Sequence, residues 1–457
     1  MNSRNIAQYI ISFLLREEGL PGALSEMVGY TTDPAEMLRY KVVIVPSGFF
    51  ETVNYGHAHS LPPIPPKMWG DTPLLYGDPV IERKGPVEPI LLYADIVAST
   101  YFLISRYEEM YYRDVRDRFG RFPGKESYPY KANFIHRPII EEYGDKLREL
   151  LRESGAEVPD SPQGFSRVNL THDIDCPYEY HGLRSFMRAW FREGKPLLTS
   201  YRLAFRNVMR DRFWTFPRFL EWNKELTREI PDICRTYFFY KTPGKSVLDR
   251  PNYRVSRYPV RKIHALAEKY HVAEGLHIPV SASDSSEEIC RAKKLLERDL
   301  SKSTDKARYH FLMATEPENY LFLEENNIFD DYTMGYADIS GFRLGTSRPV
   351  RFILPTTGEI TRITMHPLTL MDVSLDRGQY MDLGEKEAFN YALALLEQVA
   401  LHGGELNLLF HNDSLAKEVH PFHSRLYREL LRDILRLQHR FHPKDPEEST
   451  PSADAES

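Results

Sequence analysis

Cysteine is rare in this sequence, and long apolar runs are missing. Only three of the 457 residues are cysteines, Cys176, Cys234 and Cys290, and none belongs to a Cys-x-x-Cys pair. These counts exclude a disulfide-stapled fold and a zinc knuckle built from thiolates. No stretch approaches the ~18 apolar residues that a membrane span requires. With 42% hydrophobic and 27% charged residues, the composition is that of a soluble globular protein of two or three domains.

The first residues also lack the continuous apolar core and the small-residue cleavage site of a signal peptide. Apolar residues in the segment 6–14 recur at helical spacing instead, and Glu17 and Glu18 follow them. This pattern predicts an amphipathic helix. The expected location of the protein is therefore the cytoplasm.

Net charge is small, at −6, and it is unevenly distributed. Residues 443–457 carry −4, and the near-neutral remainder lacks the basic field that general nucleic-acid binding needs. Residues 184–214 carry +6, with tryptophan, phenylalanine and leucine interleaved. This basic segment is either a solvated insertion or a surface for an anionic partner, such as a lipid-linked or nucleotide-linked sugar or a membrane face.

Hydropathy and turn residues divide the chain into four parts. The parts are a smaller N-terminal α/β domain (1–154), a linker rich in proline, glycine and serine (155–166), a strand–helix repeat (167–442) and a disordered acidic tail (443–457). The strands expected after the linker cover residues 168–175, 234–240, 274–280 and 405–413. Strands that alternate with helices predict a parallel sheet or barrel.

Acidic and histidine residues gather where the predicted strands end, which is where α/β sheets and barrels keep their sites. Asp173 and Asp175 lie two residues apart, so both side chains address the same side of the strand. Two carboxylates so close repel unless a cation separates their roles, and solvated loop acids are the alternative reading. His277, His310 and His411 lie at or just beyond later strands.

A metal site is the chemistry that this combination favours. Asp175, His277 and His310 come from separate elements, 102 and 33 residues apart. Three such ligands are typical of a catalytic zinc site, whose fourth position holds water. The metal lowers the pKa of that water and polarises a carbonyl group.

In their order, these segments resemble the polysaccharide deacetylase family (carbohydrate esterase family 4, with the chitooligosaccharide deacetylase homology domain). The matching segments are Thr-His-Asp-Ile-Asp at 171–175, Arg-Thr-Tyr-Phe-Phe at 235–239, Ala-Glu-Gly-Leu-His at 273–277 and Leu-Asn-Leu-Leu-Phe-His at 406–411. The resemblance covers about residues 165–440, and its middle part is similar to a bacterial subgroup with an N-terminal accessory domain. It implies a distorted (β/α)7-type barrel preceded by a smaller α/β domain.

The resemblance also implies roles for individual residues. Asp173 matches the catalytic base, Asp175 and His277 match metal ligands, and His411 matches the general acid. The family arginine that orients the base matches Arg308 or Arg343, of which we favour Arg308. Three further residues, Arg343, Asp331 and Asn412, are candidates for contact with the substrate or for support of the site.

One position departs from the family pattern. The second ligand histidine, expected four residues after His277, is Ser281 here. His310 is the best substitute for it. If His310 pointed elsewhere, the site would bind metal weakly or not at all.

The implied activity is the metal-dependent removal of N-acetyl groups from a saccharide, with one divalent cation, most simply Zn²⁺, in the metabolism of cell-surface polysaccharide. Two alternatives stay open at this point. The same barrel is able to hydrolyse another amide C–N bond, or the chain is a non-catalytic carbohydrate-binding protein with a degenerate metal site, which the serine at 281 motivates.

Overall fold

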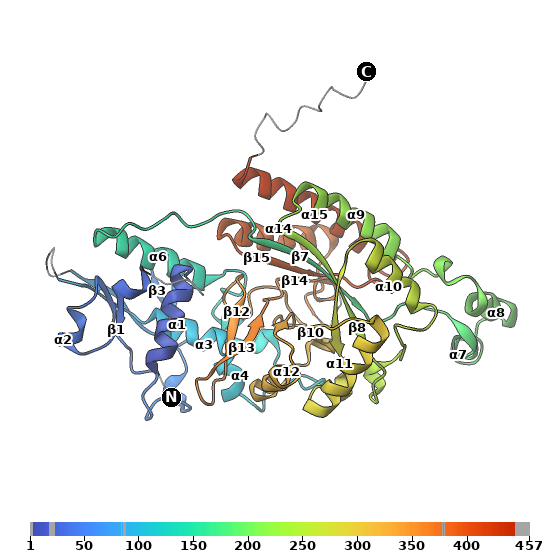
Figure 1. Ribbon diagram of the computed structural model, residues 1–457, viewed down its shortest axis with the longest axis horizontal. Coiled ribbons are helices and arrows are strands. Elements are labelled where there is room, and N and C mark those ends of the chain that lie inside the picture. Colours follow the sequence, from blue (N-terminus) through green and yellow to red (C-terminus); the bar gives the residue numbers. More distant parts are fainter. Residues whose placement is uncertain are drawn as a thin grey trace, which may run out of the picture.

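The computed structural model describes residues 3–17, 23–83, 85, 88–376, 378 and 380–443. Two sheets organise these residues, a small one near the N-terminus and a large one in the middle of the molecule (Figure 1). Apart from Pro443, the predicted acidic tail lies outside the described residues. Within the described part of the chain, no helix is long and apolar enough to cross a bilayer.

The N-terminal sheet has four strands in the order β1-β2-β6-β5, and β5 is its single antiparallel strand. Its centre is fully buried, because β2 contains only the apolar residues Val-Val-Ile. The apolar run in residues 42–45 thus provides β2. The strands here, with a separate β3–β4 hairpin, are β1 Val28–Tyr30, β2 Val42–Ile44, β3 Lys67–Trp69, β4 Thr72–Leu74, β5 Gly77–Glu82 and β6 Ile90–Ala94.

The large sheet has nine strands in the order β12-β13-β11-β10-β9-β8-β7-β15-β14. Every neighbouring pair is parallel except β12 with β13. The bounds are β7 Arg167–Ile174, β8 Cys234–Lys241, β9 Ala273–Ile278, β10 Lys306–Tyr309, β11 Asp330–Asp331, β12 Val350–Ile353, β13 Ile360–Met365, β14 Leu370–Met371 and β15 Glu405–Leu409. The predicted α/β class is confirmed. The sheet has nine strands rather than the seven βα units expected of the barrel, and no pairing of described residues joins its edge strands.

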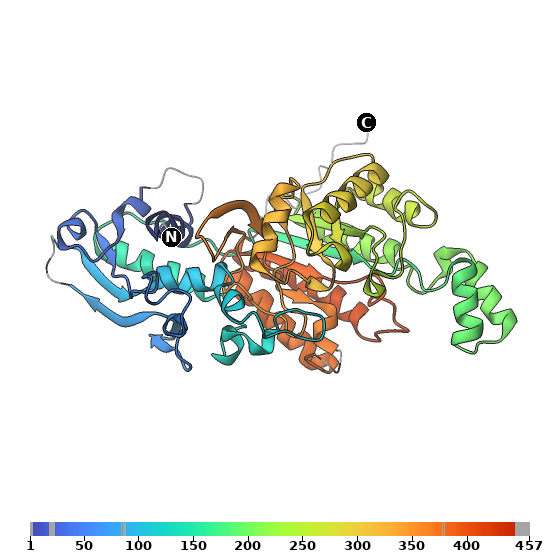
Figure 2. The same ribbon diagram turned by 90° about the horizontal axis from the view of Figure 1, so that it is seen from below.

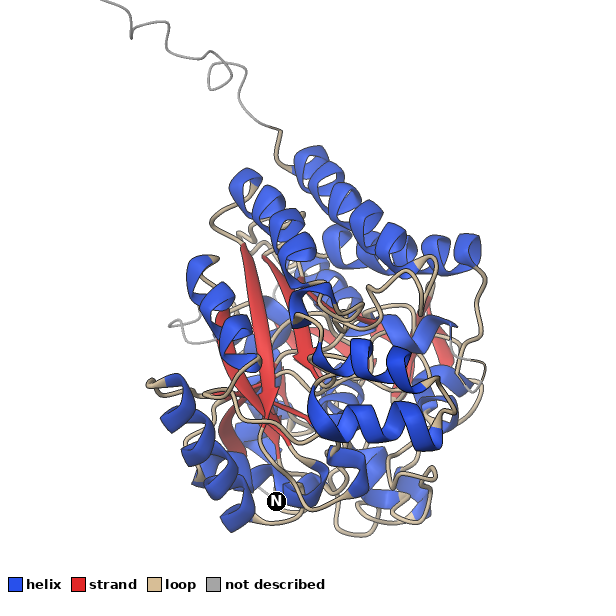
Figure 3. Ribbon diagram, turned by 90° about the vertical axis from the view of Figure 1, so that its right-hand side faces the viewer, coloured by secondary structure: helices blue, strands red, loops and turns tan. Residues whose placement is uncertain are grey.

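Helices surround these strands on both faces (Figure 3). Their apolar stripes face the sheet, as in α15, where Leu426, Leu430, Ile434 and Leu437 are buried at helical spacing. The bounds are α1 Ser3–Leu15, α2 Pro34–Met37, α3 Ile96–Ile104, α4 Tyr107–Tyr111, α5 Tyr128–Lys131, α6 Ile139–Glu153, α7 Gly182–Met187, α8 Leu197–Phe205, α9 Phe216–Glu229, α10 Val260–Lys269, α11 Ser286–Leu300, α12 Leu321–Glu325, α13 Asp372–Asp376, α14 Glu385–Leu401 and α15 His423–Phe441.

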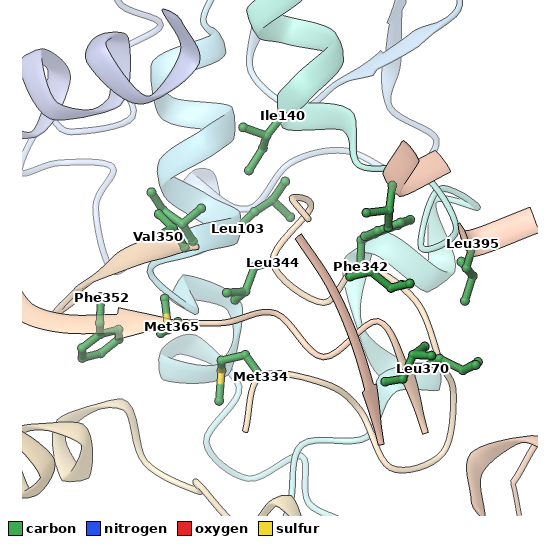
Figure 4. Packing of buried hydrophobic residues seen from close by; sticks show 14 of the residues in the cluster. Leu103, Ile140, Met334, Phe342, Leu344, Val350, Phe352, Met365, Leu370 and Leu395 are labelled. Atoms are coloured by element: carbon green, nitrogen blue, oxygen red, sulfur yellow. The ribbon is translucent and has the colours of Figure 1, made fainter. Parts of the chain in front are cut away.

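The N-terminal segment and the large sheet share one continuous apolar core. Figure 4 shows Leu103 of α3 and Ile140 of α6 packed beside Leu344, which precedes β12. Gly345 makes this approach feasible, because its φ of +66° favours glycine and an added Cβ would lie 2.5 Å from the Leu103 side chain. Its carbonyl accepts a hydrogen bond from the Ile140 amide at 3.0 Å.

A buried ion cluster crosses the same interface. Glu109 of α4 forms ion pairs with two arginines. Its carboxylate oxygens lie 2.5 Å from Nη2 of Arg106 and 2.7 Å from Nη2 of Arg343. All three side chains are at most 5% exposed. Burial alone would raise the pKa of Glu109, but the two arginines hold it below its usual value. The cluster therefore fixes the N-terminal segment to the chain that precedes β12.

Removing the charge of Glu109 should destabilise the protein strongly. In Glu109→Gln, two buried guanidinium groups lose their counterion, which typically costs about 3–5 kcal/mol. The matched control is Glu153→Gln, because Glu153 pairs with Arg83 at the surface, where such pairs are worth about 0–1 kcal/mol. Denaturant unfolding measures both variants. Equal losses of stability would contradict the assigned importance of the buried cluster.

Candidate metal centre and active site

The candidate site lies at the carboxyl edge of the large sheet, where parallel strands deliver their last residues to the same place. Asp173 is the last residue but one of β7, Asp175 directly follows the strand, and His277 lies near the end of β9. His310 directly follows β10, and His411 follows β15. Because β7 lies between β15 and β8 in the sheet, these side chains converge from both directions.

Three of these residues form a compact cluster of potential ligands. Nitrogen and oxygen atoms of Asp175, His277 and His310 all lie within 4.8 Å of one another. The Nε2 atom of His277 is 3.2 Å from Oδ1 of Asp175, and Nε2 of His310 is 3.4 Å from Oδ2. Two imidazoles and one carboxylate from separate elements match the donor set of a catalytic zinc site.

Hydrogen bonding around the cluster leaves atoms free for a cation. His277 donates from Nδ1 to the carbonyl of Arg308 at 2.9 Å, which sets the tautomer and leaves Nε2 as a lone-pair donor. That Nε2 atom and Oδ1 of Asp175 are buried without a hydrogen-bond partner among the described residues. Nδ1 of His310 lies 3.5 Å from the carboxylate of Asp249, the outer partner expected of a ligating histidine. The residues thus fit a divalent cation.

The electrostatics of the cluster also favour the binding of a cation. Burial favours the neutral carboxyl of Asp175, but His310, Lys241 and His277 hold its pKa well below the usual value. Conversely, burial lowers the pKa of His310, while Asp175 raises it to above its ordinary value. The carboxylate therefore stays ionised and attracts positive charge into this pocket.

Ser281 does not take part in this cluster. Its hydroxyl accepts a hydrogen bond from the Lys245 amide at 2.8 Å, and its own amide donates to Asp249 at 3.2 Å. Asp249 is thereby held between this loop and His310. The structure thus places His310, and not the residue four positions after His277, within reach of Asp175.

His310 begins a turn with an unusual backbone. The next two residues, Phe311 and Leu312, have φ values of +59° and +55°. Residues other than glycine rarely adopt positive φ values. Arg121, from the N-terminal segment, donates to the carbonyl of Phe311 at 3.0 Å. The ring of Phe119 packs on that of Phe311 at 5.4 Å. Sequence reasoning missed this contribution, because nothing in the 119–121 pattern points to a turn about 190 residues away.

Asp173 is held by a fully buried arginine. Nη1 of Arg308 donates to Oδ1 of Asp173 at 2.8 Å, Nη2 donates to the hydroxyl of Thr171 at 2.9 Å, and Nε donates to the carbonyl of Tyr332 at 2.9 Å. The second oxygen of Asp173 lies 3.4 Å from Nε2 of His277. Asp173 thus keeps one oxygen on the arginine and turns the other toward the cluster.

His411 forms a second functional pair, with Asp372 at the start of α13. Nδ1 of His411 lies 2.9 Å from Oδ1 of Asp372, and the His411 amide donates to Oδ2 at 2.7 Å. Burial would lower the pKa of His411, but the Asp372 carboxylate raises it to about 10. Nε2 of His411 lies 3.7 Å from Asp175. No role was predicted for Asp372 from the sequence.

The three other predicted site residues lie away from the pocket wall. Arg343 is engaged by Glu109 and by the carbonyl of Gly335, so Arg308 and not Arg343 contacts Asp173. Asp331 accepts hydrogen bonds from Tyr320 at 2.7 Å and from Thr333. Asn412 donates to the carbonyls of Cys176 and Phe213. None of these three residues lines the pocket, and Asn412 supports the loop after Asp175. A contact of any of them with substrate stays a prediction.

A pocket of about 200 Å³ opens over these groups. Its lining combines these carboxylates and imidazoles with apolar side chains. The apolar side chains are Leu248, Phe311, Leu312, Ala337, Met371, Val373 and Leu409. A larger groove of about 1100 Å³ lies between α1 and β12–β13, but neither the metal cluster nor the His411–Asp372 pair lines it. The smaller pocket is therefore the candidate active site.

Comparisons with known proteins cover the two parts of the chain differently. Residues 5–156 match a family of unknown function, DUF7033. No curated protein matches the chain significantly. Among solved structures, a Mycobacterium smegmatis protein assigned to the polysaccharide deacetylases is 13% identical, with a TM-score of 0.38, over 61% of this chain and 86% of its own. A mutant CE4-family pseudoenzyme with restored activity is 10% identical, with a TM-score of 0.28, over 60% and 67%. Likeness at this level establishes neither fold nor activity.

Loss of His310 should empty the cluster of metal. With only Asp175 and His277 left as ligands, His310→Ala should lower zinc content after dialysis from about one ion per chain to nearly none. The control is His264→Ala, because His264 is partly buried against Glu274 on another part of the surface. Elemental analysis of the purified variants measures the result. Unchanged zinc in His310→Ala would refute His310 as a ligand.

Proposed function

We propose that the protein is a zinc-dependent hydrolase that removes N-acetyl groups from a saccharide. The observation that carries the proposal is the convergence on one pocket of three elements: the Asp175–His277–His310 cluster, Asp173 with its arginine, and His411 with its carboxylate. Amide hydrolysis requires an activated water, stabilisation of an oxyanion and a proton for the departing amine. The sequence resemblance to polysaccharide deacetylases supports the same assignment.

Asp175, His277 and His310 would hold the cation. When bound, a divalent cation supplies Lewis-acid polarisation of the amide carbonyl and lowers the pKa of a water molecule. Asp173 then serves as general base, because its oxygen on the cluster side is free to accept the proton of the attacking water. Arg308 donates a hydrogen bond to the other oxygen of this carboxylate and fixes its orientation.

His411 serves as the general acid. The raised pKa keeps its imidazole protonated, and Asp372 fixes the ring through Nδ1, so that Nε2 faces the pocket. Nε2 is thus the atom that transfers a proton to the leaving nitrogen, without which the amine would depart as an unstable anion. A proton donor in this position typically contributes about 10²–10⁴ in rate.

The shape of the pocket suits an acetyl group. Leu312, Met371 and Leu409 belong to one buried apolar cluster, and they line the same pocket as the charged groups. An acetamide presents a methyl group on one side and polar atoms on the other, and a pocket that offers both apolar and charged groups suits it. We propose an N-acetylated saccharide as the substrate, with cell-surface polysaccharide as its setting.

Asp173→Asn should separate catalysis from metal binding. The amide cannot accept the proton of water, so acetate release from N-acetylated oligosaccharides should fall by about 10²–10⁴, while zinc content stays at the wild-type level. Asp232→Asn, at an exposed position on the turn before β8, is the matched control and should keep wild-type rates.

The same assay distinguishes the proposed deacetylase from a hydrolase of another amide bond and from a non-catalytic carbohydrate-binding protein. Zinc-loaded protein that releases no acetate from any N-acetylated oligosaccharide would contradict the proposed activity. Loss of zinc in Asp173→Asn would instead contradict the division of roles between Asp173 and Asp175.

A further inference from the structure

A helical hairpin projects from the molecule between β7 and α9 in the chain (Figure 1). It comprises α7, the π-helical turn Arg188–Arg192, α8 and the short turn Val208–Arg210, and we call residues 182–210 the α7–α8 hairpin. Figures 1 and 2 both show it standing clear of the rest of the molecule at one end. The chain enters it shortly after Asp175 and returns to the body at α9. The hairpin is therefore an insertion at the site edge of the large sheet.

The base of the hairpin is fixed firmly to the body. The buried carboxylate of Asp211 accepts hydrogen bonds from the amides of Glu179 and Tyr180 at 2.8 and 3.1 Å, and it pairs with Arg206 at 3.0 Å. Beyond the hairpin, the hydroxyl of Thr215 donates to the carbonyl of Asn412 at 2.7 Å. Hydrogen bonds thus hold the base of the hairpin in place, while the surface beyond the base is exposed.

That surface is unusually apolar. Nine of the nineteen large apolar side chains that are exposed in the described residues lie within this one hairpin. Along α7 and its π-helical turn, and again along α8, they recur at helical spacing and form two stripes. The nine are Leu183, Met187, Trp190, Phe191, Leu197, Leu198, Tyr201, Phe205 and Met209. Exposed apolar clusters of this extent mark interaction surfaces.

The same hairpin carries cations without counterions. Arg188 and Lys195 pair with Glu193, and Arg206 pairs with Asp211. Four further arginines are exposed and make no ion pair with any described residue: Arg184, Arg192, Arg202 and Arg210. Arginines interleaved with aromatic and aliphatic side chains on a helix surface are the pattern of elements that lie in the interface of a membrane.

We propose that the α7–α8 hairpin docks on an anionic lipid bilayer, with its apolar stripes in the interface and its free arginines at the lipid phosphates. A bilayer satisfies both features at once, because it offers an apolar layer directly beneath a layer of negative charge. A second copy of this chain fits less well. In a two-fold contact through the hairpin, the unpaired arginines of the two copies would face one another.

Flotation of the full-length protein with lipid vesicles tests this inference. The protein should float with vesicles of phosphatidylcholine mixed with phosphatidylglycerol at low salt, and much less with phosphatidylcholine alone. High salt should weaken the binding, because the arginine–phosphate attraction is screened. The fluorescence of Trp190 should shift to shorter wavelength on binding, and Trp190→Phe should remove that shift.

Variants of the hairpin separate its two features. Phe191→Asp combined with Leu198→Asp should lower vesicle affinity by more than about tenfold, since two charges enter the apolar stripes. Arg192→Ala and Arg202→Ala should each lower it by about fivefold. The matched controls, Leu38→Asp and Arg39→Ala, change exposed residues of the N-terminal segment and should bind as the wild type does.

Three results would overturn the inference. The first is a wild-type protein that does not float with anionic vesicles at low salt. The second is unchanged vesicle binding by the Phe191→Asp/Leu198→Asp variant. The third is sedimentation that shows a dimer which the double variant dissociates, with no vesicle binding, because the hairpin would then be a contact between copies. All substituted side chains are exposed, so the variants should fold, and circular dichroism checks this.

Discussion

The guanidinium of Arg308 is the group on which the geometry of the candidate site depends. It is fully buried, lies 4.7 Å above the ring of Phe239, and binds Asp173, Thr171 and the carbonyl of Tyr332. One side chain from β10 thus connects β7 with the segment after β11. The backbone carbonyl of Arg308 also orients His277 by accepting a hydrogen bond from its Nδ1.

Charge balance explains why so many ionisable groups can share a small pocket. Asp173 and Asp175 would repel each other in a buried place if each lacked a counterion. Arg308 neutralises the first, and the imidazoles around Asp175 leave room for a cation at the second. Asp372 holds the outer nitrogen of His411 at 2.9 Å, and Asp249 lies 3.5 Å from that of His310. Asp173, His277 and His411 thus each have one atom that is held by a partner and a second atom that points toward the cluster.

The N-terminal segment also contributes to the site. Arg106 binds the carbonyls of Ala314 and Thr315, and Arg121 binds that of Phe311, so both hold the stretch of chain that begins with His310. This stretch carries two consecutive residues in the left-handed region, a conformation that persists only where surrounding contacts enforce it. The position of a candidate metal ligand therefore depends on residues outside the large sheet.

Much of this arrangement could be predicted from the sequence, because strand ends in a parallel sheet meet at one edge. Asp173, Asp175, His277 and His411 all follow apolar strand patterns, which indicated their proximity. His310 was predicted as a ligand because it lies just beyond a strand of its own, and because Ser281 occupies the position of the second family histidine. Asp372 and Arg121 could not be found in this way, because each acts through a contact between distant segments and belongs to no periodic pattern. The role of Arg343 was ambiguous for the same reason, since its partner Glu109 lies 234 residues away.

The most direct test of the central claim is a crystal structure of the zinc-loaded protein with anomalous scattering measured at the zinc edge. The claim predicts a single strong peak, with ligand atoms of Asp175, His277 and His310 at about 2.0–2.2 Å and Asp173 outside that distance. A peak coordinated by other residues, or none in this pocket, would contradict it.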